Sequence, residues 1–323
     1  MDPNAYDLYL RGRSEWDSWN EQPVRSSIEY FERAIQQDSG YAPAWAGLSD
    51  AYMGLGGASV LPTELAWRKA KSAALRAIQL DASLSEAHAS LAMVLAHVDW
   101  SWSEADKEFR RAIDLNPNNA FAHQMYGDIL EARGQFDAAI WEMRRALELD
   151  PLSPNKQNTL GASLYRAGRY DEALPYFLEV PDPDFVSVNR HRRIAAIYER
   201  QGRMGEAISE WMTAVSLSGK EEAAAAVERA YRSFGYAAAK RAYLRGDLQD
   251  ALRRAQKGYP RPRSLDVAAD YALLGDRGRA FEWIERASRE REWPVMYLRV
   301  DDRFEALRSD PRFRDLSRRI GLP

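Results

Sequence analysis

The sequence predicts an all-α protein built as a solenoid of stacked helix–turn–helix repeats. The first observation is a period of 34 residues, kept by a glycine, an alanine and a bulky apolar residue. These residues are Gly134, Gly168 and Gly202; Ala139, Ala173 and Ala207; and Met143, Phe177 and Trp211. The second observation is that apolar residues between these positions recur at helical intervals. Because several positions keep one register, one structural unit is expected to be repeated along the chain.

The first helix of each repeat is predicted by a stripe of residues spaced three and four apart. The stripe reads His123, Tyr126, Gly127 and Leu130; then Gln157, Leu160, Gly161 and Leu164; then His191, Ile194, Ala195 and Tyr198. A glycine ends this helix, because glycine enters a left-handed turn without steric cost. A second helix follows, as in "DAAIWEMRRALELDP", and a proline closes it.

These units resemble the tetratricopeptide repeat family, whose hairpins of about 34 residues carry the pattern W-L-G-Y-A-F-A-P. The matching residues are Trp45, Leu48 and Tyr52 in one unit and Gly127, Ala139, Ala146 and Pro151 in another. The resemblance implies a right-handed α-solenoid whose first helices line a concave groove. It also implies a role in binding proteins.

In chain order, the register gives units at 5–39, 42–82, 85–117, 120–151, 154–181 and 188–219. The first unit carries an insertion around Trp16 to Pro23, and the second a glycine-bearing loop, "MGLGGAS", at 53–59. We therefore expect a tetratricopeptide array of about six helix pairs over residues 1–219.

The register drifts over 221–259 and returns in "YALLGDRGRAFEWIERA" at 271–287. The last residues are expected to form a capping helix, because an open end of a solenoid would expose apolar surface. Residues 220–323 are thus expected to be divergent repeats and capping helices, continuous with the same solenoid.

The composition excludes several classes of function. A net charge of −3 gives no basic field that would attract nucleic acid or an anionic membrane. The absence of cysteine excludes disulfides, thiolate catalysis and cysteine-based metal sites. No apolar run approaches the roughly 18 residues that cross a bilayer, so no membrane insertion is expected. We expect a cytoplasmic chain that belongs to a longer protein, with Met1 as an added initiator.

The stretch "HVDWSWSEAD" at 97–106 gathers a histidine, two tryptophans and three acids, and so raises the question of a ligand site. The register puts Trp102 in the packing position held by Phe136, Tyr170 and Met204 in other units. The acids lack the i, i+4 spacing to His97 that a helical metal site would use. We therefore predict a packing role.

The other candidate sites also favour structural roles. His88, His123 and His191 share one repeat position, and equivalent residues of stacked repeats lie on the order of 10 Å apart. That distance is too long for a shared zinc ion, whose bonds are about 2 Å. The stretch at 53–59 lacks the Gly-Lys-Ser/Thr ending of a phosphate loop. We expect no enzyme, no catalytic residue, no metal and no cofactor.

The groove offers a candidate site for a protein or peptide. We number the positions of each first helix from the first residue of its unit, at 120, 154 and 188. The groove is expected to be lined by positions 2, 5, 9 and 12, together with the residue after position 12. The candidate residues are Gln124, Asp128, Glu131, Asn155, Asn158, Tyr165, Arg166, Asn189, Arg192 and Arg200. Amides can bond a peptide backbone, and guanidinium groups can bond carboxylate or phosphate. The alternative is a solvated groove without a ligand, because about half of a helix surface in water is polar.

The stretch "RHRRIAAIYERQGR" at 190–203 is locally basic, but Glu199, Glu206 and Glu210 interrupt the charge. Nucleic-acid binding would need that charge to continue along a face with interleaved aromatics. No direct nucleic-acid binding is therefore expected.

The whole chain is also similar to the tetratricopeptide tails of large bacterial signalling proteins. The similar stretches are "AYDLYLRGR", "SIEYFERAI", "DWSWSEADKEFRRAIDLNPNNA", "AGRYDEAL" and "DDRFEALRSDPRFRDL". In that group the tail follows a winged-helix domain, a Ser/Thr kinase or a nucleotide cyclase. The similarity implies a non-catalytic regulatory or sensing tail in signalling or transcription regulation. The alternative is a homo-oligomerisation module, such as a homodimer, that uses exposed Trp16, Trp19 and Trp293.

Overall fold

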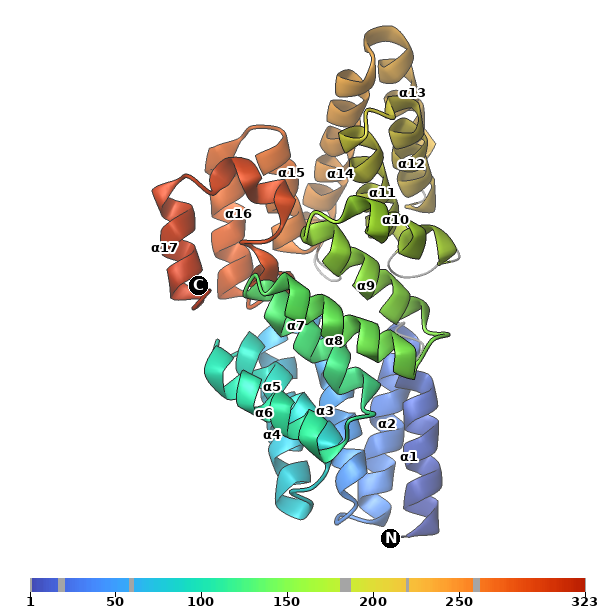
Figure 1. Ribbon diagram of the computed structural model, residues 1–323, viewed down its shortest axis with the longest axis vertical. Coiled ribbons are helices and arrows are strands. Elements are labelled where there is room, and N and C mark those ends of the chain that lie inside the picture. Colours follow the sequence, from blue (N-terminus) through green and yellow to red (C-terminus); the bar gives the residue numbers. More distant parts are fainter. Residues whose placement is uncertain are drawn as a thin grey trace.

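The protein is described here by a computed structural model that covers residues 2–16, 21–57, 61–180, 187–218, 221–257 and 262–322. Within these ranges all regular structure is helical, which confirms the predicted all-α repeat solenoid. The helices follow one another in packed pairs along the long axis of the molecule (Figure 1). None of the described helices is both long and apolar enough to span a membrane.

Residues up to 218 contain the six helix pairs that the period outlines. They are α1 (Pro3–Trp16) with α2 (Glu21–Gln37), α3 (Ala42–Gly57) with α4 (Thr63–Leu80), α5 (Ser85–His97) with α6 (Trp102–Leu115), α7 (Ala120–Ala132) with α8 (Phe136–Leu149), α9 (Pro154–Arg166) with α10 (Tyr170–Glu179), and α11 (Ser187–Arg200) with α12 (Met204–Leu217).

Two further helix pairs and three short helices follow in the described part of the sequence. They are α13 (Glu221–Phe234) with α14 (Tyr236–Lys257), α15 (Ser264–Leu273) with α16 (Arg277–Arg289), the short 3₁₀ helices η1 (Trp293–Tyr297) and η2 (Asp302–Leu307), and α17 (Pro311–Arg319).

The periodic residues make the hairpins. Gly134, Gly168 and Gly202 have φ of 75°, 76° and 75°, the left-handed region that ends a helix. The following amide closes the turn on the carbonyl five residues back, as Arg169 does on Leu164 at 2.9 Å. The periodic alanines are fully buried between the paired helices. The 34-residue period therefore records one turn and one close helix contact per repeat.

The prediction of a loop at 53–59 is wrong for residues 53–57, because these residues form the end of α3. The glycines there serve close packing. A Cβ on Gly54 would lie 2.5 Å from the Trp16 ring, and a Cβ on Gly56 would lie 2.9 Å from Ala66. Residues 58–60 lie outside the described residues.

The chain's last part turns back onto the repeats. Figure 1 shows the C-terminus near α7 and far from α13 and α14, the helix pair that precedes α15 in the sequence. The indole Nε1 of Trp102 donates to the carbonyl of Ile320 at 3.0 Å, and Arg291 donates to the carbonyl of Val98. We call residues 291–322 the C-terminal segment, and the side of α5, α7, α9 and α11 that faces it the inner face.

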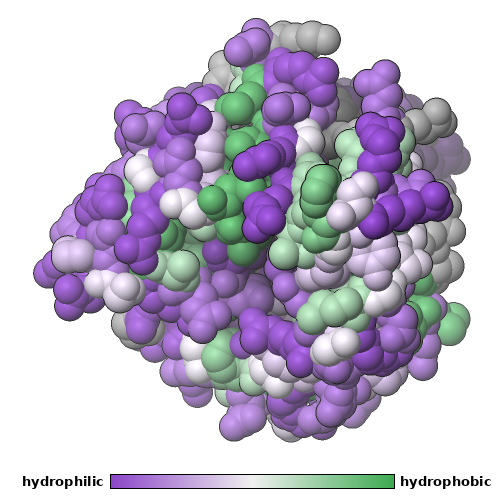
Figure 2. Space-filling view, turned by 90° about the horizontal axis from the view of Figure 1, so that it is seen from above, coloured by the Kyte–Doolittle hydropathy of each residue, from purple (hydrophilic) through white to green (hydrophobic). Residues whose placement is uncertain are grey.

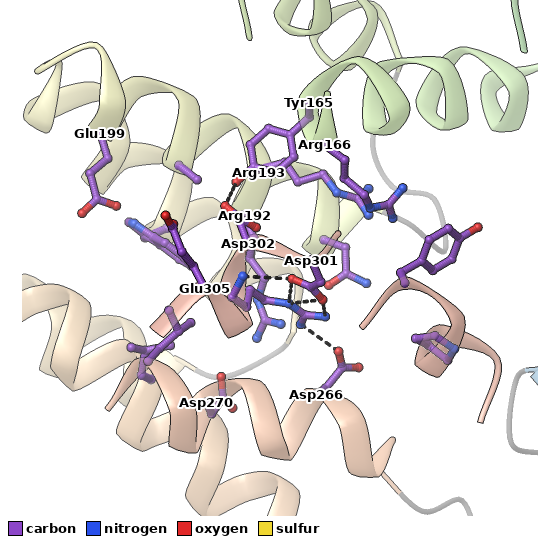
Figure 3. A pocket seen from close by; sticks show the side chains of 18 of the residues that line it. Tyr165, Arg166, Arg192, Arg193, Glu199, Asp266, Asp270, Asp301, Asp302 and Glu305 are labelled. Carbon is purple, nitrogen blue, oxygen red and sulfur yellow. Dashed lines mark hydrogen bonds and ion pairs between the residues drawn. The ribbon is translucent and has the colours of Figure 1, made fainter. Parts of the chain in front are cut away.

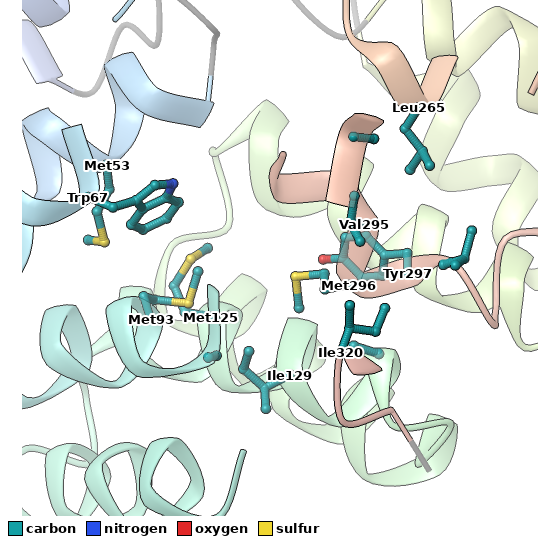
Figure 4. Packing of buried hydrophobic residues seen from close by; sticks show 14 of the residues in the cluster. Met53, Trp67, Met93, Met125, Ile129, Leu265, Val295, Met296, Tyr297 and Ile320 are labelled. Carbon is teal, nitrogen blue, oxygen red and sulfur yellow. The ribbon is translucent and has the colours of Figure 1, made fainter. Parts of the chain in front are cut away.

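An apolar core joins the C-terminal segment to the inner face. Met93, Met125 and Ile129 of the repeats face Met296 and Ile320 (Figure 4). All five side chains are at most 4% exposed. Because burying one such side chain contributes about 1.5–3 kcal/mol, this contact is large on the scale of domain stability. In contrast, the face seen from above is mostly hydrophilic, with a narrow apolar stripe (Figure 2).

Substituting the turn glycine tests the hairpin geometry. Gly168→Ala is expected to lower the free energy of unfolding by about 1–2 kcal/mol, since an L side chain is strained at positive φ. Gly205→Ala is the control, because Gly205 is helical and a Cβ there meets no atom within 4 Å. Equal melting temperatures for the two variants would contradict this account of the turn.

Candidate functional site on the inner face

A cavity of about 680 Å³ lies between the inner face and the C-terminal part of the chain. Its walls come from α9, α11, α12, α14, α15 and residues 293–305, so helices far apart in sequence share it (Figure 3). We call it the central cavity. Its volume is in the range that small-molecule sites occupy.

Six of the ten groove residues predicted from the sequence line the central cavity. They are Asn158, Tyr165, Arg166, Asn189, Arg192 and Arg200. They come from α9 and α11, at equivalent positions of adjacent repeats. The helical register thus brings these side chains to one place.

The other four predicted residues, Gln124, Asp128, Glu131 and Asn155, do not line the cavity. Gln124 and Asn155 satisfy each other, because Nε2 of Gln124 donates to Oδ1 of Asn155 at 2.6 Å. Glu131 is fully buried and forms an ion pair with Arg166. These groups hold neighbouring repeats together.

The C-terminal segment occupies much of the groove that the sequence predicts. The hydroxyl of Tyr165 donates to Asp302 at 2.5 Å, and Arg200 reaches the same carboxylate at 3.4 Å. The Arg166 guanidinium lies 4.4 Å from the centre of the Tyr297 ring. Side chains that would otherwise face an open groove are therefore engaged by the chain itself.

Arg303 organises the carboxylates of the cavity wall. It bonds Asp301 at 2.6 Å and Asp266 at 2.9 Å (Figure 3). Burial alone would raise the pKa of each aspartate, but the Arg303 charge outweighs it and the pKa of both is lowered. Both carboxylates are thus ionised and committed to Arg303.

Two other aspartates have a raised pKa instead of a lowered one. Burial, reinforced by the Glu131 charge, raises the pKa of Asp128 to about 7, although Tyr297 donates a hydrogen bond to it. Burial also raises the pKa of Asp270 to about 7, despite the nearby charge of Arg192. Both aspartates therefore titrate near neutral pH.

Arg193 is a cavity residue that the sequence analysis missed. It lines the central cavity between Arg166 and Arg303 and is half-buried. Its repeat position is held by Thr159 and Met125 in the two preceding units, so no shared residue type marked it. The basic stretch at 190–203 was the available signal, and Arg193 shows that part of it points inward.

The stretch "HVDWSWSEAD" has a packing role, as predicted, but its partners are distant in sequence. The ring of His97 lies 4.1 Å from that of Trp293 and 5.0 Å from that of Trp67. Burial lowers the pKa of His97 to about 3, so the ring is neutral. Trp102, at the start of α6, is buried beneath Ile320.

The aromatics expected to form an exposed oligomerisation surface are not exposed. Trp16 is 3% exposed and packs against Gly54 of α3. Trp293 is half-buried against His97. The expectation is wrong for these two residues, because Trp16 packs against α3 and Trp293 packs against Trp67 and His97. Trp19 lies outside the described residues.

Three histidines that share a repeat position also share a hydrogen-bonding role. Nδ1 of His88 bonds Glu108 at 2.6 Å, and Nδ1 of His123 bonds Glu142 at 2.5 Å. His191 forms the same bond to Glu210 on the paired helix. Across the described ranges, no group of three or more His, Cys, Asp or Glu side chains is placed to hold a metal ion. These histidines therefore join paired helices.

The raised pKa of Asp128 predicts a pH-dependent stability. Because the folded-state pKa is above the unfolded value of 3.8, the folded chain binds the extra proton between about pH 4 and 7. Stability should fall as pH rises through this window. Asp128→Asn removes the titration, so from pH 4 to pH 8 its free energy of unfolding should rise relative to that of wild type by on the order of 4 kcal/mol.

Asp137→Asn provides the control, because the Asp137 carboxylate on α8 is fully exposed. Denaturant unfolding at several pH values measures both variants. A difference between Asp128→Asn and wild type that stays constant with pH would contradict the assignment.

The comparisons with known proteins agree with this architecture. The family model for the tetratricopeptide repeat matches residues 108–140. The pilus biogenesis factor PilW has a TM-score of 0.50 and 17% identity, covering 67% of this chain and 94% of its own. The Cut9–Hcn1 tetramer of the APC/C gives 0.50 and 18%, covering 68% of this chain and 45% of its own.

A thermophilic tetratricopeptide protein of Thermus thermophilus gives a TM-score of 0.48 at 16% identity, over 60% of this chain and 99% of its own. No curated protein matches the sequence. Identities this low show similarity of fold alone. The chain thus contains a tetratricopeptide repeat at 108–140 and has the tetratricopeptide-repeat fold.

Proposed function

We propose that the chain is a non-catalytic scaffold that binds a protein or peptide on its inner face. The tetratricopeptide fold is one that serves protein–protein interaction. The observation that carries the proposal is the central cavity, where Asn189 and Arg200 of α11 remain accessible beside Asn158. An amide and a guanidinium on the same helix can bond the backbone and a carboxylate of an extended segment.

The C-terminal segment limits what this surface can accept. It covers the inner face of α5 and α7, so the accessible part lies along α9 and α11. A partner therefore either inserts a short segment into the central cavity or displaces the C-terminal segment. Both modes fit a regulatory role better than a static assembly role.

The wider context is part of the same proposal. The similarity of five stretches to the tails of bacterial signalling proteins supports a cytoplasmic regulatory or sensing tail of a longer protein. In that setting the scaffold would report the presence of its partner to a catalytic or DNA-binding domain. No direct nucleic-acid binding is proposed, because Arg192 and Arg193 line the central cavity and Arg203 pairs with Glu206.

Homo-oligomerisation is the second candidate function. The two most exposed large aromatic side chains among the described residues are Trp141 on α8, at 61%, and Phe234 at the end of α13, at 81%. Sedimentation of the full chain over a range of concentrations decides this alternative. A monomer at every concentration argues against self-association.

A paired substitution tests the inner face. Peptides that bind the full chain are first selected from a displayed library. They should bind the double variant Asn189→Ala, Arg200→Ala at least about tenfold more weakly than wild type, a loss of about 1.4 kcal/mol in binding free energy. The melting temperature should change little, because the contacts of Arg200 with Asp302 and with the Tyr170 ring lie at the surface.

The matched control is Asn118→Ala, Arg144→Ala, which removes the same side-chain types from exposed positions away from the cavity. Calorimetric titration gives the dissociation constants. Equal weakening by both double variants, or none by the first, would remove support for this surface.

A further inference from the structure

The cations of the central cavity do not all have partners. Seven cationic side chains line it within the described residues, and five of them pair with carboxylates. A sixth, Arg263, donates to the backbone carbonyl of Gly57 at 3.2 Å. Arg193 is the seventh.

Arg193 forms no side-chain hydrogen bond or ion pair with any residue that the structure describes. Its surroundings make this costly. Burial and the like charges of Arg166 and Arg303 lower its pKa to about 10, so the guanidinium is still charged at neutral pH. A half-buried cation without a counter-ion is destabilising, because it loses hydration and gains no ion pair.

Three of the acids that line the cavity are already engaged by other groups. Asp301 and Asp266 are held by Arg303, and Asp302 accepts from Tyr165 and Arg200. Figure 3 shows Arg193 reaching into the space beside Arg166. A fork of free N–H donors therefore faces the central cavity.

A second unpaired group lines the same cavity. Asn158 is 5% exposed, and its Oδ1 has no hydrogen-bond partner among the described residues. A buried acceptor of this kind normally has a donor, and leaving it without one costs about 1–3 kcal/mol. The cavity thus lacks an anion for Arg193, and Asn158 in its wall carries a buried acceptor without a partner among the described residues.

The apolar part of the wall completes the requirements. Trp211, Tyr243, Leu244 and Trp293 line the central cavity together with these polar groups. Concave sites that combine an apolar wall with a few fixed polar groups are typical of small organic ligands.

The geometry points to a binding site for a small organic anion, in which Arg193 forms a forked ion pair with a carboxylate or phosphate group of a ligand whose apolar body fills the cavity. The ligand would contact both α11 and the C-terminal segment, and so would hold the segment in place. This inference deepens the proposed function, since it places a small effector at the same inner face.

The test uses the full chain and four probes: 3-phenylpropionate, phenyl phosphate, inorganic phosphate and the neutral 3-phenylpropionamide. Binding is followed by tryptophan fluorescence, by calorimetry and by the melting temperature. At least one aromatic anion should bind saturably and raise the melting temperature, while the amide should bind at least about tenfold more weakly. Preference for phenyl phosphate over 3-phenylpropionate, or the reverse, identifies the anionic group.

Arg193→Gln should lower the affinity for the anion at least about tenfold and leave the weak affinity for the amide unchanged. Without ligand, this variant should melt at or above the wild-type temperature, because it removes an unpaired charge. If Arg193 instead stabilised the fold, Arg193→Gln would melt at a lower temperature than wild type. Arg145→Gln, which changes an exposed arginine on α8, is the control and should bind like wild type.

Equal binding of the anions by wild type and Arg193→Gln would overturn the inference. So would failure of every aromatic anion to bind wild type at millimolar concentration, or equal affinity for the amide. If library peptides bind but no anion does, this inference fails and the proposed scaffold stands. If anions bind but no peptide does, the site stands and the peptide-binding proposal fails.

Discussion

The docking of the C-terminal segment on the inner face is the contact on which the rest of the structure depends. It joins Met296 and Ile320 to Met93, Met125 and Ile129 in one apolar core. An array of stacked hairpins would otherwise make contacts only between neighbours. This contact instead ties together residues far apart in the chain and converts an open groove into a partly covered cavity.

Several unusual features of the inner face follow from this docking. Glu131 becomes buried and Arg303 half-buried, and each is compensated by an ion pair, Glu131 with Arg166 and Arg303 with Asp301 and Asp266. Asp128 becomes so poorly hydrated that its pKa is raised toward neutrality. The compensation is incomplete at Arg193 and Asn158. Buried polar groups normally have partners, and these two groups are the basis of the proposed ligand site.

The sequence predicted local and periodic features well, and long-range ones poorly. A period of 34 predicts hairpins because each turn glycine and each buried alanine acts within its own repeat. The same period predicts that Asn158, Arg192 and Arg200 lie on one side of adjacent helices, and all three line the central cavity. It could not reveal that Trp102 meets Ile320, or that Trp293 is half-buried against His97, because neither contact repeats. Arg193 was missed for the same reason, since its surroundings are created by a segment outside the repeats.

The contact between His97 and Trp293 gives the most direct measurement of the docking, because the centres of these rings lie 4.1 Å apart although the residues are distant in the chain. A double-mutant cycle with His97→Ala and Trp293→Ala isolates their coupling energy from denaturant unfolding. The account predicts a coupling of about 0.5–1.5 kcal/mol, as for aromatic pairs in contact. Strict additivity of the two substitutions would contradict the docked arrangement.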